Sequence, residues 1–303
     1  MKQNQLGYIH ATAYNEQTEY IVGIGEALWD MLPAGKQIGG APANFAYHVS
    51  QLGLKSCVVS AIGCDELGDE IISNFESKNL TYLLARTDKP TGTVQVTLTG
   101  EGIPCYEIME GVAWDNIPFS KELENLAHHT RAVCFGSLAQ RQKVSATSIN
   151  RFLDLIPNDG KHLKIFDINL RQSFYNKETI ENSLRKCNIL KINDDEIISI
   201  AHLFGYQETD MQSIARVLKK EYDLQMLILT CGVNGSYVFH EGGMSFLETP
   251  KVKVADTVGA GDSFTAAFVA TLLKGHDVCD AHKQAVELSA FVCTQKGAMP
   301  DYK

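Results

Sequence analysis

The stretch Asp256-Thr257-Val258-Gly259-Ala260-Gly261-Asp262-Ser263-Phe264 carries the strongest structural signal in this chain of 303 residues. It joins a segment predicted as a strand, residues 251–254, to a helix predicted over residues 260–274. Glycines at such a junction let backbone N–H groups converge on one point, and the helix dipole adds positive potential there. Residues 259–261 are therefore predicted to form an anion hole that can hold a phosphoryl group.

Asp262 lies in the first turn of that predicted helix, beside the hole. A carboxylate in this place can accept the proton of an alcohol as the alcohol attacks phosphorus. The aspartate could equally cap the helix, with the glycines forming a tight turn, and the Gly-x-Gly-Asp spacing alone does not separate the two interpretations.

A second glycine-rich segment, Gly39-Gly40-Ala41-Pro42-Ala43-Asn44-Phe45-Ala46, opens a helix predicted over residues 41–52. The paired glycines allow the backbone to approach a ligand closely. Asn44, one turn into the helix, can donate and accept hydrogen bonds at once, which suits a polyol. Taken alone, a loop-to-helix junction with a surface asparagine is the simpler interpretation.

The rest of the chain predicts an α/β protein. Apolar runs alternate with helical patterns, which indicates a parallel sheet covered on both faces. Residues 91–99 instead alternate apolar and polar side chains and are followed by a short strand near 105–108, so a hairpin with one solvated face is predicted. We expect one α/β domain over residues 21–303 and a disordered or loosely docked extension over residues 1–20. The other strands are predicted at 21–25, 57–62, 132–135, 163–168, 189–192, 226–229, 236–239 and 244–247.

Composition narrows the range of functions. The chain is 45% hydrophobic and 21% charged, as in ordinary globular proteins. Its net charge of −9 argues against a nucleic-acid partner, because such binding usually needs a basic face. The eight cysteines form no C-x-x-C pair, and no apolar stretch is long enough to span a bilayer. We therefore expect a cytoplasmic protein with neither nucleic-acid nor membrane partners.

In order and separation, the two glycine-rich segments resemble the signature segments of the ribokinase (PfkB) family of carbohydrate kinases. The similarity extends over about residues 21–298, and the form Gly-Gly-Ala-Pro-Ala-Asn resembles the fructokinase branch rather than the Gly-Gly-Lys-Gly-Ala-Asn typical of ribokinases. The resemblance implies a three-layer α/β/α ribokinase-like fold. It also implies a small β-sheet lid built from about residues 26–38 and 91–109.

The resemblance assigns roles at the sugar and phosphoryl sites. Gly25-Glu26-Ala27-Leu28-Trp29-Asp30 matches a family segment whose acid binds sugar hydroxyls, which points to Asp30, together with Gly39, Gly40 and Asn44. Asp167-Ile168-Asn169-Leu170-Arg171 matches the family's D-x-N-x-R segment, so Arg171 is expected to pair with phosphate or transition-state charge. An arginine paired with a neighbouring aspartate is the alternative.

Two further segments match nucleotide and magnesium sites of the family. Thr230-Cys231-Gly232-Val233-Asn234-Gly235 resembles its T-x-G-x-x-G turn, so Thr230, Gly232 and Gly235 are expected to contact ATP. Asn193-Asp194-Asp195-Glu196 matches its N-x-x-E segment, so Asn193 and Glu196 are expected to hold a hydrated Mg²⁺ against ATP. A hairpin turn and an acid-rich helix start are the respective alternatives.

A monovalent-cation site is a further implication of the resemblance. Gln295-Lys296-Gly297-Ala298, with Asp256 and Val258, resembles the segments that line a K⁺ site in many members. Carbonyl oxygens would bind the ion there and buttress the anion hole.

The resemblance thus implies ATP-dependent phosphorylation of a sugar hydroxyl, with D-fructose converted to fructose 6-phosphate and Asp262 acting as general base. A kinase of the same family for 2-keto-3-deoxygluconate, ribose or a nucleoside is an alternative, as is a non-catalytic sugar- or nucleotide-binding regulator. Asp262, both hole glycines and Arg171 argue against the regulator. A phosphofructokinase would need added basic residues that the sequence does not identify. An open-faced lid sheet would favour a homodimer.

Overall fold

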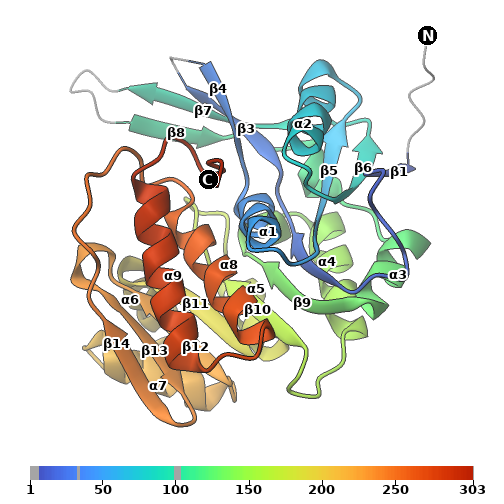
Figure 1. The fold of residues 1–303 in the computed structure, drawn as a ribbon. Coiled ribbons are helices and arrows are strands. Elements are labelled where there is room, and N and C mark those ends of the chain that lie inside the picture. Colours follow the sequence, from blue (N-terminus) through green and yellow to red (C-terminus); the bar gives the residue numbers. More distant parts are fainter. Residues whose placement is uncertain (1–6, 33–34, 99–103, 303) are drawn as a thin grey trace.

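Two β-sheets organise the chain in this computed structural model, which describes residues 7–32, 35–98 and 104–302 (Figure 1). The larger sheet consists of β1 (Gly7–His10), β2 (Tyr20–Ile24), β5 (Ser56–Gly63), β6 (Tyr82–Thr87), β9 (Thr130–Phe135), β10 (Leu163–Asp167), β11 (Ile189–Asn193), β12 (Met226–Thr230), β13 (Ser236–His240) and β14 (Gly243–Leu247). Its order is β1-β6-β5-β2-β9-β10-β11-β12-β13-β14. All pairs from β6 to β12 are parallel, and the pairs at the two edges are antiparallel.

Helices cover both faces of this sheet, because its central strands are apolar on both sides. Phe45, Phe268 and Ile165 share a core on one face, and Phe152, Leu184 and Phe166 share a core on the other. The predicted three-layer arrangement is confirmed. The first face carries α1 (Ala41–Gln51), α2 (Glu66–Ser77), α8 (Ala260–Leu273) and α9 (Val278–Cys293), and the second carries α3 (Lys121–His128), α4 (Lys143–Leu155), α5 (Lys177–Lys186), α6 (Asp194–Phe204) and α7 (Met211–Glu221).

The smaller sheet matches the predicted lid. It contains β3 (Leu28–Leu32), β4 (Gly35–Gly39), β7 (Gly92–Leu98) and β8 (Pro104–Ile108), in the order β4-β3-β7-β8. Figure 1 places it above the larger sheet. Because β2 ends at Ile24 and β3 begins at Leu28, the lid stands at the carboxyl edge of the parallel strands, where α/β sheets bind ligands.

Three segments differ from the sequence prediction. Residues 82–87, for which no strand was predicted, form β6 and pair in parallel with β5. Part of the expected loose extension is strand β1, which pairs with β6 from Gly7 opposite Arg86 to His10 opposite Leu83. Backbone pairing with an edge strand needs little apolar side-chain surface, so the polar composition did not reveal it. Residues 251–254, expected as a strand, pair with no described strand and are exposed. Their alternating Lys and Val side chains have no sheet to face.

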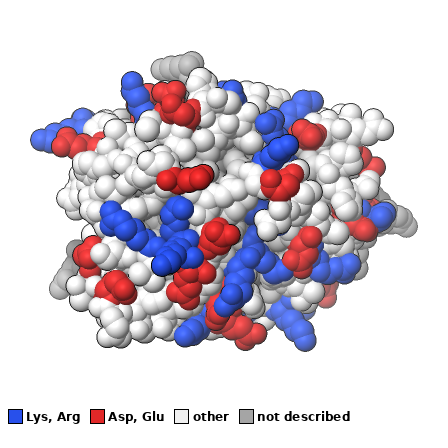
Figure 2. Space-filling view, turned by 90° about the horizontal axis from the view of Figure 1, so that it is seen from below, with Lys and Arg blue, Asp and Glu red and all other residues white. Residues whose placement is uncertain are grey.

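The surface carries charges of both signs. On the face seen from below in Figure 2, Lys and Arg side chains lie interspersed with Asp and Glu. Of the helices in the described ranges, none has the length and apolar character needed to cross a membrane.

Candidate active site

The start of α8 forms the predicted turn. Gly259, the residue before the helix, adopts the left-handed conformation at φ 79°, and no side chain caps the helix. A Cβ on Gly259 would lie 2.7 Å from Ala298 Cβ, so only glycine fits. Ala260 N–H already donates to Thr257 O at 3.3 Å, which corrects the predicted set of hole amides. Within the described residues, the N–H groups of Gly259, Gly261 and Asp262 have no protein acceptor and remain for an anion.

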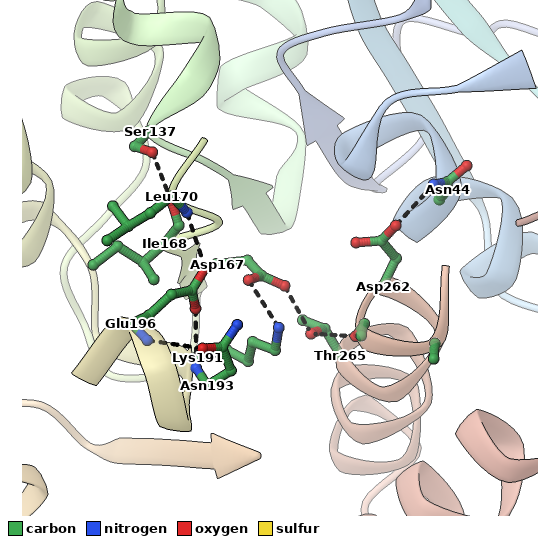
Figure 3. Close-up of polar contacts among 12 residues, drawn as sticks. Asn44, Ser137, Asp167, Ile168, Leu170, Lys191, Asn193, Glu196, Asp262 and Thr265 are labelled. Atoms are coloured by element: carbon green, nitrogen blue, oxygen red, sulfur yellow. Dashed lines mark hydrogen bonds and ion pairs between the residues drawn. The ribbon is translucent and has the colours of Figure 1, made fainter. Parts of the chain in front are cut away.

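Asp262 points from the first turn of α8 toward α1 (Figure 3). Asn44 Nδ2 donates a hydrogen bond of 2.8 Å to Asp262 Oδ2. Burial and the nearby Asp167 raise the pKa of Asp262 to about 6, against the opposing effects of Asn44, Lys191 and Arg171. A carboxylate with a pKa near neutrality can take up a proton during a reaction at pH 7.

A charged layer lies beneath the turn. Lys191 Nζ on β11 lies 3.2 Å from Asp167 Oδ1 on β10, and both side chains are more than nine-tenths buried. Thr265 Oγ1 lies 3.2 Å from Asp167 Oδ2 and 3.0 Å from Gly261 O, so the ion pair is joined to α8 (Figure 3). Burial opposes the charge of Lys191, but the surrounding carboxylates outweigh it and raise its pKa.

Lys191 approaches the anion hole from below. Its Nζ lies 3.0 Å from the place that a Cβ on Gly261 would take. Sequence reasoning missed this residue, although a lysine inside the apolar strand Ile189–Asn193 is itself a signal. Lysines are almost never fully buried unless they are paired.

Asp30 and the two early glycines meet at the base of the lid. A Cβ on Gly39 would lie 2.6 Å from Asp30 Oδ2, and a Cβ on Gly40 would lie 2.3 Å from Glu26 O. Gly40 has φ 111° and starts α1 without a side-chain cap. Burial raises the pKa of Asp30 to about 6, opposed by Arg171 and reinforced by Asp256. The structure therefore brings the predicted sugar-binding residues Asp30, Gly39, Gly40 and Asn44 to one end of α1.

Glu26 is an acid in this region whose role sequence reasoning missed. It is 3% exposed, and its Oε2 has no hydrogen-bond partner among the described residues. Burial raises the pKa of Glu26 to about 7. Its own N–H and that of Ala41 act against the shift, as does Arg171, whereas Asp262 reinforces it. The available sequence signal was the position of an acid between two apolar segments, which form β2 and β3.

Arg171 follows β10 on an exposed loop, where its Nη1 donates to Leu170 O at 3.1 Å. It forms no ion pair with an acid of the described residues. Its positive charge nevertheless lowers the pKa values of Asp262, Glu26 and Asp30. Arg171 is thus a cation beside the site, and its predicted contact with phosphate stays a prediction.

Asn193 and Glu196 form a capping box at the start of α6. Asn193 Oδ1 accepts from Glu196 N at 2.8 Å, and Glu196 Oε2 accepts from Asn193 N at 3.0 Å. Glu196 Oε1 accepts from Leu170 N at 2.9 Å (Figure 3). Each oxygen keeps a second acceptor position, so the pair fits a hydrated ion held through water. No cluster of three or more potential metal ligands occurs among the described residues, and the predicted Mg²⁺ contact stays a prediction.

The predicted nucleotide turn lies beside that capping box, because Thr230 at the end of β12 pairs with Asn193 at the end of β11. Gly232 and Gly235 both have positive φ, at 52° and 97°. Cys231 N donates to Gly235 O at 2.8 Å and closes the turn. The predicted ATP contacts of Thr230, Gly232 and Gly235 stay predictions.

Asp256 ties the turn before α8 to the C-terminal segment. Its Oδ1 accepts from Val258 N at 3.1 Å, and its Oδ2 accepts from Gly297 N at 3.1 Å. These two contacts bring together the segments expected to line a K⁺ site. The ion itself stays a prediction.

Known proteins are similar to this chain over most of its length. The model of the pfkB family of carbohydrate kinases matches residues 33–303. A fructokinase from Escherichia coli is 27% identical over 294 residues, which cover 91% of this chain and 94% of that protein. An ATP-dependent 6-phosphofructokinase from Thermoanaerobacterium thermosaccharolyticum is 27% identical over 307 residues, which cover 95% of this chain and 92% of that protein.

The fold is shared with solved kinases. A fructokinase double mutant from Vibrio cholerae O395, solved with fructose, ADP and a potassium ion bound, superposes with a TM-score of 0.77 at 21% identity. The match covers 94% of this chain and 96% of that one, and the predicted ribokinase-like fold is confirmed. Because the family model spans almost the whole sequence, the chain belongs to the pfkB family of carbohydrate kinases and is a sugar kinase.

Proposed function

We propose that the protein transfers the γ-phosphoryl group of ATP to the terminal hydroxyl of D-fructose, forming fructose 6-phosphate and ADP. The observation that carries this proposal is the contact between Asn44 and Asp262 beside unbonded N–H groups at the start of α8. An acid and unbonded N–H groups within one turn of each other support the proposal of a proton acceptor next to an anion hole.

Asp262 takes the proton of the attacking hydroxyl as the oxygen bonds to phosphorus. Its raised pKa lets it hold that proton near neutral pH. The amides of Gly259 and Gly261 stabilise charge on the moving phosphoryl group, with Lys191 beneath them and Arg171 beside them. Positioning of the reactants and electrostatic stabilisation of the transition state therefore accelerate phosphoryl transfer.

The sugar lies between the lid and α1 in this proposal. Asp30 accepts hydrogen bonds from its hydroxyls, Gly39 and Gly40 let it approach the backbone, and Asn44 orients it next to Asp262. Lid closure excludes water, so that ATP is not hydrolysed. The form of the segment around Asn44 and the fructokinases among the relatives favour fructose over other sugars.

ATP lies over the turn formed by Thr230, Gly232 and Gly235. When bound, Mg²⁺ supplies charge neutralisation to the phosphates, and Asn193 and Glu196 hold it through water. Asp256 and Val258 line the proposed K⁺ site, which lies beside the anion hole. The lid sheet pairs with that of a second copy to form a homodimer.

A screen for ADP release tests the proposal. The enzyme is assayed with ATP, Mg²⁺ and one acceptor at a time: fructose, fructose 6-phosphate, ribose, 2-keto-3-deoxygluconate and several nucleosides. ADP formed with fructose alone is the expected result. ADP with another acceptor only would replace the substrate and keep the mechanism, and no ADP with any acceptor would favour a non-catalytic regulator.

A further inference from the structure

Arg141 sits at a junction between the lid and the core. It follows β9 and a short helix, Leu138–Gln140. Its Nε donates to Asp115 Oδ1 at 2.7 Å, and its Nη2 donates to Asp115 Oδ2 at 2.9 Å. The two side chains are 3% and 1% exposed, respectively. This bidentate ion pair is buried within the described fold.

The same guanidinium holds the end of the lid. Arg141 Nη2 donates to Met109 O at 2.5 Å, directly after β8, and Met109 N donates to Thr93 O on β7 at 3.2 Å. Asp115 Oδ2 also accepts from Gly111 N at 3.0 Å. The segment that leaves the lid is therefore fixed by contacts that converge on Arg141 and Asp115.

Two aromatic rings lie next to the guanidinium. The Arg141 Cζ lies 4.1 Å from the Trp114 ring centre and 4.6 Å from the Phe174 ring centre. Phe174 belongs to the loop after β10, and its N–H donates to Arg171 O at 3.1 Å. One side chain thus links the segment that leaves the lid to the loop that carries Arg171.

We propose that Arg141 is a positioning residue that couples closure of the lid to the placement of Arg171. It acts through Phe174 on the loop side and through Met109 on the lid side, and it does not itself touch the substrates. This inference rests on the proposed phosphoryl transfer, because Arg171 has its role only in that reaction.

The site uses properties that only arginine has. The planar fork bonds both oxygens of Asp115 and the Met109 carbonyl while two aromatic rings lie next to it, whereas lysine offers a single rotating ammonium. Arg141 Nη1 is buried with no partner among the described residues. Arg141 also lines a cavity of about 150 Å³ together with Glu110 and residues 173–176. The cavity gives the Arg141 side chain room to move. When the lid moves, the unpaired Nη1 can form a hydrogen bond that it lacks in this structure.

The test uses Arg141→Lys and Phe174→Leu in the full-length enzyme. Phe174→Leu keeps the ion pair and removes one aromatic contact, so it remains informative if Arg141→Lys does not fold. Arg151→Lys on α4 is the matched control, because the Arg151 Cζ also lies over a ring, 3.9 Å from the centre of Phe119, but Arg151 has no hydrogen bond or ion pair with Asp115 or Met109 among the described residues. The measurements are kcat, KM for both substrates, and the ratio of ATP consumed to sugar phosphate formed.

Both junction variants are expected to lose kcat roughly 10- to 100-fold, the usual effect of a misplaced catalytic group. ATP consumed per sugar phosphate should rise above one, because an uncoupled lid admits water, and Arg151→Lys should match the wild type. Wild-type kcat and coupling in the folded junction variants would overturn the inference, and so would a loss of kcat at an unchanged ratio. A wild-type enzyme that phosphorylates no acceptor would instead overturn the proposed function.

Discussion

Asn44 Nδ2 lies 2.8 Å from Asp262 Oδ2, and this hydrogen bond joins residues that are 218 positions apart. It brings together the first turns of α1 and α8. Both helices start after a glycine with positive φ, Gly40 and Gly259, and neither start has a side-chain cap. Two uncapped helix starts therefore direct positive potential toward the place where an acid and a phosphoryl group would meet.

Removing the Asn44 amide should raise the pKa of Asp262, because that hydrogen bond stabilises the ionised carboxylate. The base acts in its ionised form, so activity is lost as the pH falls through its pKa. In Asn44→Ala, the acid limb of kcat/KM should move to higher pH, and kcat/KM at pH 6 should fall roughly tenfold. A limb that stays in place would show that Asn44 does not tune the base.

Glu26→Gln should leave the same limb close to its wild-type position. Glu26 and Asp262 disfavour each other's ionisation only while both are charged. Because the pKa of Glu26 is raised to about 7 and that of Asp262 to about 6, Glu26 is mostly protonated where Asp262 titrates. Glutamine therefore replaces a largely neutral side chain of the same shape. The pH dependence of kcat/KM measures the limb, and a clear shift to lower pH would contradict the raised pKa of Glu26.

Gly259→Ala should cost both stability and activity, since the new Cβ would overlap Ala298. Gly275→Ala is the matched control, because Gly275 also has positive φ, at 89°, but has no neighbour within 4 Å of its added Cβ. The control should lose about 1–2 kcal/mol from backbone strain alone and keep its activity. Urea unfolding and ADP release compare the two. Equal losses would mean that packing against Ala298 is unimportant.

Lys191→Met should destabilise the fold by about 3–5 kcal/mol, because it leaves Asp167 buried without its cation. The double variant Lys191→Met/Asp167→Asn removes both charges and should recover most of that loss in urea unfolding. Thr265→Val serves as a milder comparison, since it leaves the ion pair intact. If the double variant is as unstable as Lys191→Met alone, the pairing argument fails.

The sequence was informative for features whose residues are neighbours along the chain. The glycines and Asp262 stand within one turn of each other, so a glycine turn with an acid beside it could be predicted, although the spacing alone did not separate a catalytic from a capping role. The alternation over residues 91–99 likewise predicted a strand of the lid, which became β7. In each case the signal depends only on neighbours along the chain.

The features that could not be predicted from the sequence depend on contacts between residues that are far apart in the chain. Lys191 and Asp167 become an ion pair only when β10 and β11 align, and the carboxyl of Glu26 becomes buried near the charge of Asp262 only in the folded chain. Strand β1 exists because the edge of β6 accepts it. The same limit explains the error at residues 251–254, whose alternation had no sheet to join.

Asp262→Asn should remain folded, which makes its activity interpretable. The pKa of Asp262 is raised from 3.8 to about 6 on folding, so its ionisation opposes folding at higher pH. Stability that this carboxyl contributes is present below pH 3.8 and is lost as the pH rises through about 6. At pH 8 the asparagine variant should therefore melt at a higher temperature than the wild type, in a thermal unfolding scan.

The rate of a single turnover of that variant, with saturating ATP and the sugar identified by the screen, tests the role of Asp262 most directly. With ATP binding retained, phosphoryl transfer at pH 8 should be slower than in the wild type by roughly 10²- to 10⁴-fold. Transfer at a near wild-type rate would contradict the assignment of Asp262 as the base.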